Sequence, residues 1–163
     1  MSTSSSSNSS GFSLNKFRTF DALVRHFNSD IETIEESYSP DGGFFGFLSD
    51  VRLTSATLKD GTVLPLFIKT AKEGTKIFHN STTYWTFDKE AYFYQELLPI
   101  LEEFQTRQGI STKTHLIKSY LPRFFGAGSL EVFNDGESNV TEHIVILEDL
   151  TKSGYYNTGF ANF

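Results

Sequence analysis

Lys69 stands near the end of the apolar run PLFIKT, which has the composition of a β-strand. Holding a lysine side chain in a cleft costs rotamer entropy and desolvation of its charge. A strand that only had to pack would therefore carry an apolar residue at this position. A lysine at this position therefore indicates that an anionic group lies within reach of its ammonium group.

A glycine cluster, made of Gly42, Gly43 and Gly46 in SPDGGFFG, lies between two predicted strands. Glycine permits positive φ angles and lets the backbone approach a phosphate group closely. A tight hairpin turn also needs glycines, and the cluster taken alone favours that interpretation. Phosphate binding becomes the stronger interpretation only when the cluster is combined with a fixed lysine.

Three predicted strands surround these residues. A weak strand over residues 31–38 is followed by strands over residues 47–58 and 63–70, which flank the turn Lys59-Asp60-Gly61-Thr62. Asp-Gly between two apolar runs is a strong hairpin signal. We therefore expect an antiparallel meander of three strands.

Two helices are predicted from apolar spacing. An amphipathic helix begins at Ser13, a good N-cap, and continues to about residue 29. A long helix covers residues 85–109, where Pro99 should bend or divide it and Gly109 should end it.

The last two predicted strands, over residues 115–133 and 142–150, are joined around Asn134-Asp135-Gly136. The order helix, three strands, long helix, two strands predicts an α+β fold with a mainly antiparallel five-stranded sheet and the long helix packed on one face. The expected divisions of the chain are a disordered serine-rich tail over 1–11, an N-terminal helix over 12–30, a main domain over 31–156 and a short connection over 157–163.

Charge and composition exclude several functions. Fourteen basic against twenty acidic residues give a net charge of -6, which disfavours binding to nucleic acid or anionic membranes. The absence of cysteine excludes disulfides and thiol catalysis, and four scattered histidines lack metal-ligand spacing, so no metal site is expected. Because no long apolar run or secretion signal is present, a cytoplasmic protein is the default expectation.

The predicted order resembles the N-terminal lobe of protein-kinase-like and aminoglycoside-phosphotransferase-like enzymes. It is most similar to the ecdysteroid kinase-like family, also called CHK kinase-like. The matching features are the loop GGFFGFLSDVRL, the strand FIKT, the helix motif FDKEAYFYQELLP and the segment IVILEDL followed by Gly154-Tyr155. They cover roughly residues 30–156, so the main domain is expected to be a kinase-like N-lobe.

The resemblance implies an ion pair. Lys69 would neutralise the α- and β-phosphate oxygens of ATP, and Glu90 on the long helix would hold its side chain in place. Glu96 is an alternative partner, because the short apolar motif permits more than one alignment. The remaining alternative is an unrelated domain in which the lysine and the glutamate do not contact each other. An arbitrary lysine and glutamate in a sequence usually form no ion pair.

The resemblance also implies further contacts with ATP. Gly46-Phe47-Leu48-Ser49 looks like the glycine-aromatic-x-serine form of some family members, with Ser49 as a phosphate donor, although the glycines depart from the GxGxxG spacing of protein kinases. IVILEDL would be the hinge, where the Glu148 carbonyl and the Leu150 amide bind adenine. The adenine faces would lie between apolar residues, for which Leu53, Ile68 and Ile146 are candidates.

The implied function is that of an ATP-binding lobe of a phosphotransferase that moves the γ-phosphate to a hydroxyl of a steroid or a similar small metabolite. No HxDxxxxN catalytic loop or metal-binding aspartate is found before the chain stops at NTGFANF. Catalytic residues and Mg²⁺ are therefore expected only for a complete enzyme, in which a C-terminal lobe or a partner protein covers the cleft. The alternative is a catalytically inactive lobe that serves as a binding or interaction module.

Overall fold

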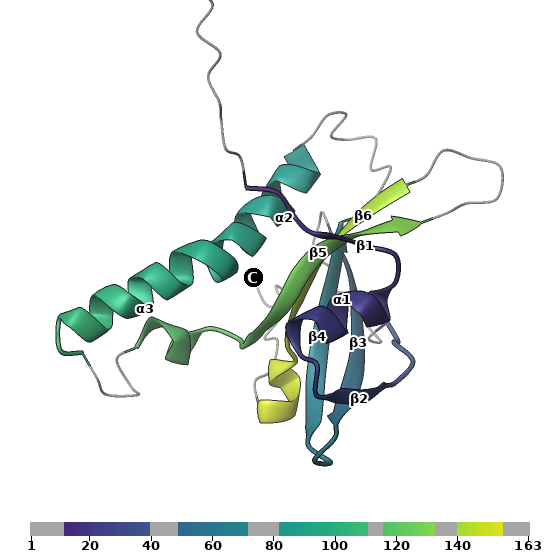
Figure 1. Ribbon diagram of the computed structural model, residues 1–163, viewed down its shortest axis with the longest axis horizontal. Helices are drawn as coiled ribbons and strands as arrows, with labels where there is room; N and C mark the ends of the chain where they lie inside the picture. The colour runs from purple at the N-terminus through teal and green to yellow at the C-terminus, as the bar shows by residue number, and fades with distance from the viewer. Residues whose placement is uncertain (1–11, 40–48, 72–81, 111–115, 133–139, 155–163) are drawn as a thin grey trace, which may run out of the picture.

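The computed structural model describes residues 12–39, 49–71, 82–110, 116–132 and 140–154 (Figure 1). Its centre is a six-stranded sheet in the order β1-β5-β6-β4-β3-β2. The strands are β1 (Lys16–Phe17), β2 (Ile31–Ile34), β3 (Ser49–Leu58), β4 (Val63–Ala71), β5 (Phe124–Val132) and β6 (Val140–Glu148).

The predicted three-stranded meander is present. β2 pairs antiparallel with β3, and β3 pairs antiparallel with β4. Gly61 closes the hairpin at a φ of 83°, and the Leu58 N–H donates to the Thr62 carbonyl at 2.8 Å. The Asp60 side chain accepts a hydrogen bond from the Thr62 N–H, and this bond lowers the pKa of the Asp60 carboxyl. Asp-Gly thus fixes this turn as the sequence indicated.

The sheet is mixed and has six strands, whereas the sequence predicted five mainly antiparallel strands. The additional strand is β1, which pairs parallel with β5 at the sheet edge. The Ser129 N–H donates to the Asn15 carbonyl at 2.9 Å beside it. An unpaired edge strand would leave its backbone groups without partners, and β1 supplies those partners along part of β5.

The first helix is correspondingly shorter than expected. Helix α1 (Phe20–Phe27) begins after Thr19, whose side chain accepts from the Ala22 N–H at 3.1 Å, and not after Ser13. Both residues are suitable N-caps, but starting at Thr19 leaves the preceding segment free to pair with β5. The local sequence therefore permits either start, and the sheet edge selects the later one.

Helix α1 covers one face of the sheet (Figure 1). Leu23 and Val24 pack there against aliphatic side chains that alternate along β4 and β6. The members of this first core, all less than 9% exposed, are Leu23, Val24, Ile31, Ala56, Leu64, Leu66, Ile68, Ile144 and Ile146. Every second residue of a strand points to the same face, so this core uses the even-numbered positions of β4 and β6.

The long helix consists of three consecutive segments: α2 (Thr82–Tyr92), the π-helical segment η2 (Phe93–Leu97) and α3 (Leu98–Arg107). Pro99 is the second residue of α3, and Leu98 separates it from the π segment. Because proline has no N–H and its ring crowds the preceding turn, it cannot continue regular α-helical bonding, and a π segment is one way to accommodate the change. The predicted division near Pro99 is thus a change of helix type.

Short 3-10 turns precede β5 and follow β6. Residues 115–133 were predicted as one strand, but Ile117–Tyr120 form the turn η3, and β5 begins only after Pro122. β5 and β6 pair antiparallel as expected, while the predicted turn Asn134-Asp135-Gly136 lies outside the described residues. Within the described part of the chain, none of the helices combines the length and the apolar character needed to cross a bilayer.

Candidate functional site

Strand alternation places Lys69 on the sheet face opposite α1. Its neighbours Ile68 and Leu66 point into the first core, whereas Phe67 packs against a second core beneath α2. This second core consists of Ala71, Phe87, Ala91, Ala127, Val145 and Leu147. Lys69 therefore lies on the face that α2 covers.

Lys69 and Glu90 form a close ion pair. Lys69 Nζ lies 2.6 Å from Glu90 Oε2, and the two side chains are 25% and 24% exposed. The Phe87 ring centroid lies 5.8 Å from the same nitrogen, within the range of a cation–π contact. The structure thus brings together the two residues that the sequence singled out. The alternative partner, Glu96, is exposed and belongs to η2.

Helix α2 carries a second polar contact to the sheet, which the sequence analysis did not predict. Asp88 Oδ1 lies 3.1 Å from Nδ1 of His143 on β6. His143 is on the same face as Val145 and Leu147, since all three occupy odd positions of β6. Strand alternation could have indicated that face of β6, but the partners are 55 positions apart in the sequence, so no local pattern links them.

An aromatic stack continues this face toward the end of β6. The rings of Tyr94 and Phe124 are parallel within 3°, with centroids 5.1 Å apart. Partial burial raises the pKa of the Tyr94 hydroxyl, and the nearby negative charge of Glu90 raises it further. Tyr94 lies in η2, one turn after Glu90, so its titration depends on the same carboxylate that pairs with Lys69.

The predicted hinge lies where β6 ends. The Glu148 N–H donates to the Arg123 carbonyl at 2.8 Å, and the Asp149 N–H donates to the Pro65 carbonyl at 3.0 Å. The buried Asp149 side chain accepts from the backbone N–H and the hydroxyl of Thr151, which caps the turn η4 (Leu150–Ser153). The chain therefore turns sharply between Glu148 and Leu150, the two residues expected to bind adenine. That role stays a prediction.

The structure reduces the number of residues that could contact the faces of the adenine ring. Ile68 is 4% exposed and Ile146 is 0% exposed, and both lie in the first core, across the sheet from Lys69. A ligand held by Lys69 cannot reach them, so these two candidates are wrong. Leu53 pairs with Phe67 on the Lys69 face and is only partly buried. Leu53 alone remains of the three.

The remaining predicted phosphate ligands lie around the start of β3. Ser49 is 5% exposed and pairs with Ala71, two positions along the ladder from the Val51–Lys69 pair. Its odd position places it on the face that carries Lys69. Gly42, Gly43 and Gly46 lie outside the described residues.

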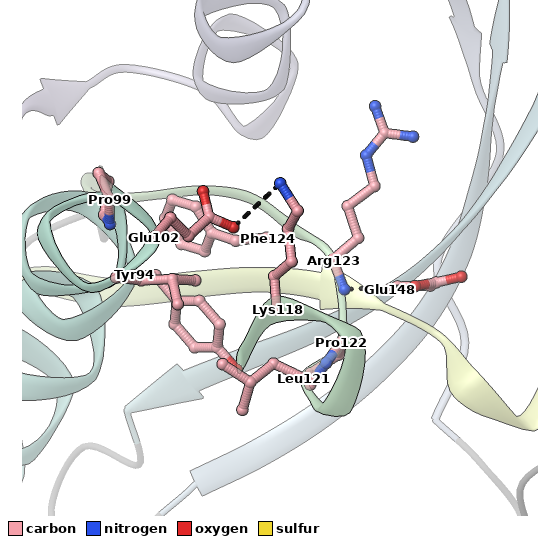
Figure 2. Close-up of a pocket in the computed structure, with 10 residues that line it drawn as sticks. Tyr94, Pro99, Glu102, Lys118, Leu121, Pro122, Arg123, Phe124 and Glu148 are labelled. Carbon is pink, nitrogen blue, oxygen red and sulfur yellow. Dashed lines mark hydrogen bonds and ion pairs between the residues drawn. The ribbon is translucent and has the colours of Figure 1, made fainter. Parts of the chain in front are cut away.

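A cavity of about 400 Å³ adjoins the aromatic stack and the hinge (Figure 2). Tyr94 and Phe124 form one part of its lining, and Glu148 reaches it from the end of β6. Figure 2 shows Lys118 turned toward Glu102, and Lys118 Nζ lies 3.2 Å from Glu102 Oε1. The cavity is thus mixed in polarity. Among the described residues no three histidine or acidic side chains gather as a metal site would require.

Comparison with known protein families gives a match over the part of the chain that contains the candidate site. The model of the ecdysteroid kinase-like family matches residues 45–159, which is more than half of the chain. The matched range includes β3 to η4 and therefore contains both Lys69 and Glu90. We found no match to this chain among curated proteins or among solved structures.

Proposed function

Because the chain belongs to the ecdysteroid kinase-like family, we propose that it is the ATP-binding lobe of a small-molecule phosphotransferase. Lys69 is the phosphate ligand, and Glu90 orients its side chain. The acceptor is a hydroxyl of a small metabolite, with steroids as one class, and the protein acts in the cytoplasm.

The Lys69–Glu90 pair is the observation that carries this proposal. An ammonium group has three N–H donors, and Glu90 takes one of them, so the others can reach ligand oxygens. The carboxylate and the Phe87 ring together restrict the long side chain, which lowers the entropy lost when a phosphate binds. A quarter of the lysine side chain is exposed, so a ligand can approach it.

The proposed reaction transfers the γ-phosphoryl group of ATP. The acceptor oxygen forms a bond to the γ-phosphorus while the bond to the β–γ bridging oxygen breaks, and ADP leaves. The charge of Lys69 stabilises the phosphates of the departing ADP, an electrostatic contribution that a fixed side chain makes without reorganising. The base that takes the hydroxyl proton and the ligands of the accompanying Mg²⁺ are not assigned to residues of this chain.

Glu148, Leu150 and Leu53 would hold the adenine in this proposal, and Ser49 would contact phosphate. Their positions support it, because Ser49, Leu53 and Lys69 share one sheet face and the hinge lies at the end of the neighbouring strand. The glycines Gly42, Gly43 and Gly46 would bring their backbone N–H groups to the phosphates.

Titration with a fluorescent ATP analogue tests the proposal. Lys69→Met should lower affinity by about tenfold or more, which corresponds to about 1.4 kcal/mol. Lys59→Met is the matched control, since it removes the same charge from an exposed lysine at the β3–β4 turn and should change affinity by less than about twofold. Equal affinities for the two variants would contradict the role of Lys69.

A further inference from the structure

We infer that Asp88 and His143 are positioning residues, which fix the rotation of α2 and so hold Glu90 against Lys69. This inference rests on the proposed function, because it names the contact that keeps the proposed phosphate ligand in place. Neither residue needs to touch the nucleotide.

The geometry of α2 places its two carboxylates on opposite flanks of its buried stripe. Phe87 and Ala91 are 2% and 0% exposed and face the second core. At about 100° per residue, Asp88 lies to one side of this stripe and Glu90 to the other. Each carboxylate meets a different strand, since Asp88 contacts His143 on β6 and Glu90 contacts Lys69 on β4.

The two strands are neighbours in the sheet, so α2 is held at two points across a β6–β4 pair. Apolar packing is non-directional, so the buried stripe of Phe87 and Ala91 restricts the distance of α2 from the sheet more than its rotation. One polar contact on one flank still allows the helix to turn about that contact. A second contact on the other flank removes this freedom, because any rotation that shortens one pair lengthens the other.

The chemistry of the pair suits a fixed contact. A carboxylate can only accept hydrogen bonds, so the proton at this contact lies on Nδ1 of His143. His143 is 18% exposed and Asp88 is 37% exposed, so solvent competes less than it does for the pair between Glu103 and Arg107 on α3, whose side chains are 62% and 73% exposed. The Glu103 pair is therefore a suitable comparison.

Zero-length carbodiimide cross-linking measures the inferred effect directly. The reagent joins a carboxylate to an amine only where the two are in contact, and mass spectrometry quantifies the Lys69–Glu90 cross-linked peptide. Asp88→Ala and His143→Ala should each lower its yield by about threefold or more, as loss of a partly buried pair worth somewhat under 1 kcal/mol would do. Glu103→Ala should leave the yield unchanged.

Conservative variants separate positioning from general stability. Asp88→Asn keeps an acceptor oxygen and His143→Asn keeps a donor near the Nδ1 position, so both should restore part of the yield. Far-ultraviolet circular dichroism reports whether each variant is folded. An unchanged yield in folded Asp88→Ala protein would overturn the inference, even if its melting temperature fell.

ATP affinity is a second measurement, and together with the cross-link it separates failure of the proposed function from failure of the positioning role. Folded Asp88→Ala protein should bind the fluorescent ATP analogue about threefold more weakly than the unaltered chain. If the unaltered chain binds no ATP while the cross-link still depends on Asp88, the proposed function fails and the positioning role stands. If ATP binds and Asp88→Ala changes neither affinity nor cross-link, the positioning role fails alone.

Discussion

The two faces of the sheet are built from different kinds of contact. Beneath α1 the buried core is aliphatic, with Leu23, Leu66 and Ile146 all at most 1% exposed. Beneath α2 the core is smaller, and polar pairs from Glu90 and Asp88 flank it. Apolar burial is non-directional, whereas an ion pair depends on geometry. The first face therefore supplies most of the stability, and the second fixes the position of particular side chains.

The largest loss of stability is expected for a substitution in the core beneath α1. Leu66→Ala should lower the free energy of unfolding by about 2–5 kcal/mol, because it leaves a cavity in a fully buried core. Urea denaturation measures the change. Val63→Ala on the same strand is the control, since Val63 is exposed and its loss should cost less than about 0.5 kcal/mol. Similar losses for both variants would remove the distinction between the faces.

The next largest loss of stability is expected where β1 and α1 approach β5 closely, at Gly128. A Cβ atom at Gly128 would lie 2.7 Å from Cε2 of Phe17 and 2.8 Å from Cδ1 of Leu23. Gly128→Ala should therefore cost about 1–3 kcal/mol of unfolding free energy. Phe17→Leu in the same chain should recover part of that cost, so a double-mutant cycle is the measurement. Additive losses would show that the ring of Phe17 is not the obstacle.

A smaller effect on stability is expected at the ion pair. Lys69→Met should lower the free energy of unfolding by about 1 kcal/mol, because the pair is partly exposed and water can solvate the Glu90 carboxylate left behind. The binding free energy for ATP should fall by at least as much, since the tenfold loss of affinity expected above corresponds to about 1.4 kcal/mol. A loss of stability equal to that of Leu66→Ala would mean that the pair is mainly structural.

The smallest effect is a dependence on alkaline pH at Tyr94. Burial and the charge of Glu90 raise the Tyr94 pKa above its usual value of 10.0, so the folded state holds this proton more tightly than the unfolded state. Its contribution is complete below about pH 10 and is lost as the pH rises through the folded-state pKa. Urea denaturation should show a steeper alkaline loss for the unaltered chain than for Tyr94→Phe. Equal slopes would contradict this assignment.

Local patterns predicted the parts of the fold that depend on neighbouring residues. Asp60-Gly61 predicted the hairpin, and the apolar run that ends near Lys69 predicted β4. Lys69 and Glu90 were paired through their resemblance to family motifs, and the contact is present. Ile68 could have been excluded from the adenine site without coordinates, because adjacent residues of a strand point to opposite faces.

Other features depend on contacts that sequence spacing does not encode. Thr19 and Ser13 are equivalent as N-caps, and only the free edge of β5 distinguishes them. The partnership of Asp88 with His143 requires the helix to lie across β6 at a specific rotation. Both are tertiary effects that override local preference.

The chain from Phe12 to Phe17 runs along the β5 edge and joins both faces of the sheet. Phe12 contacts the Tyr92 ring edge-on at 5.5 Å and packs with Leu14 against the second core, whereas Phe17 packs against the first. The family match begins only at residue 45, after this segment, α1 and β2. A recombinant fragment cut to the matched range would expose Leu66 and Ile146 to water, so it should precipitate during purification where the longer chain does not.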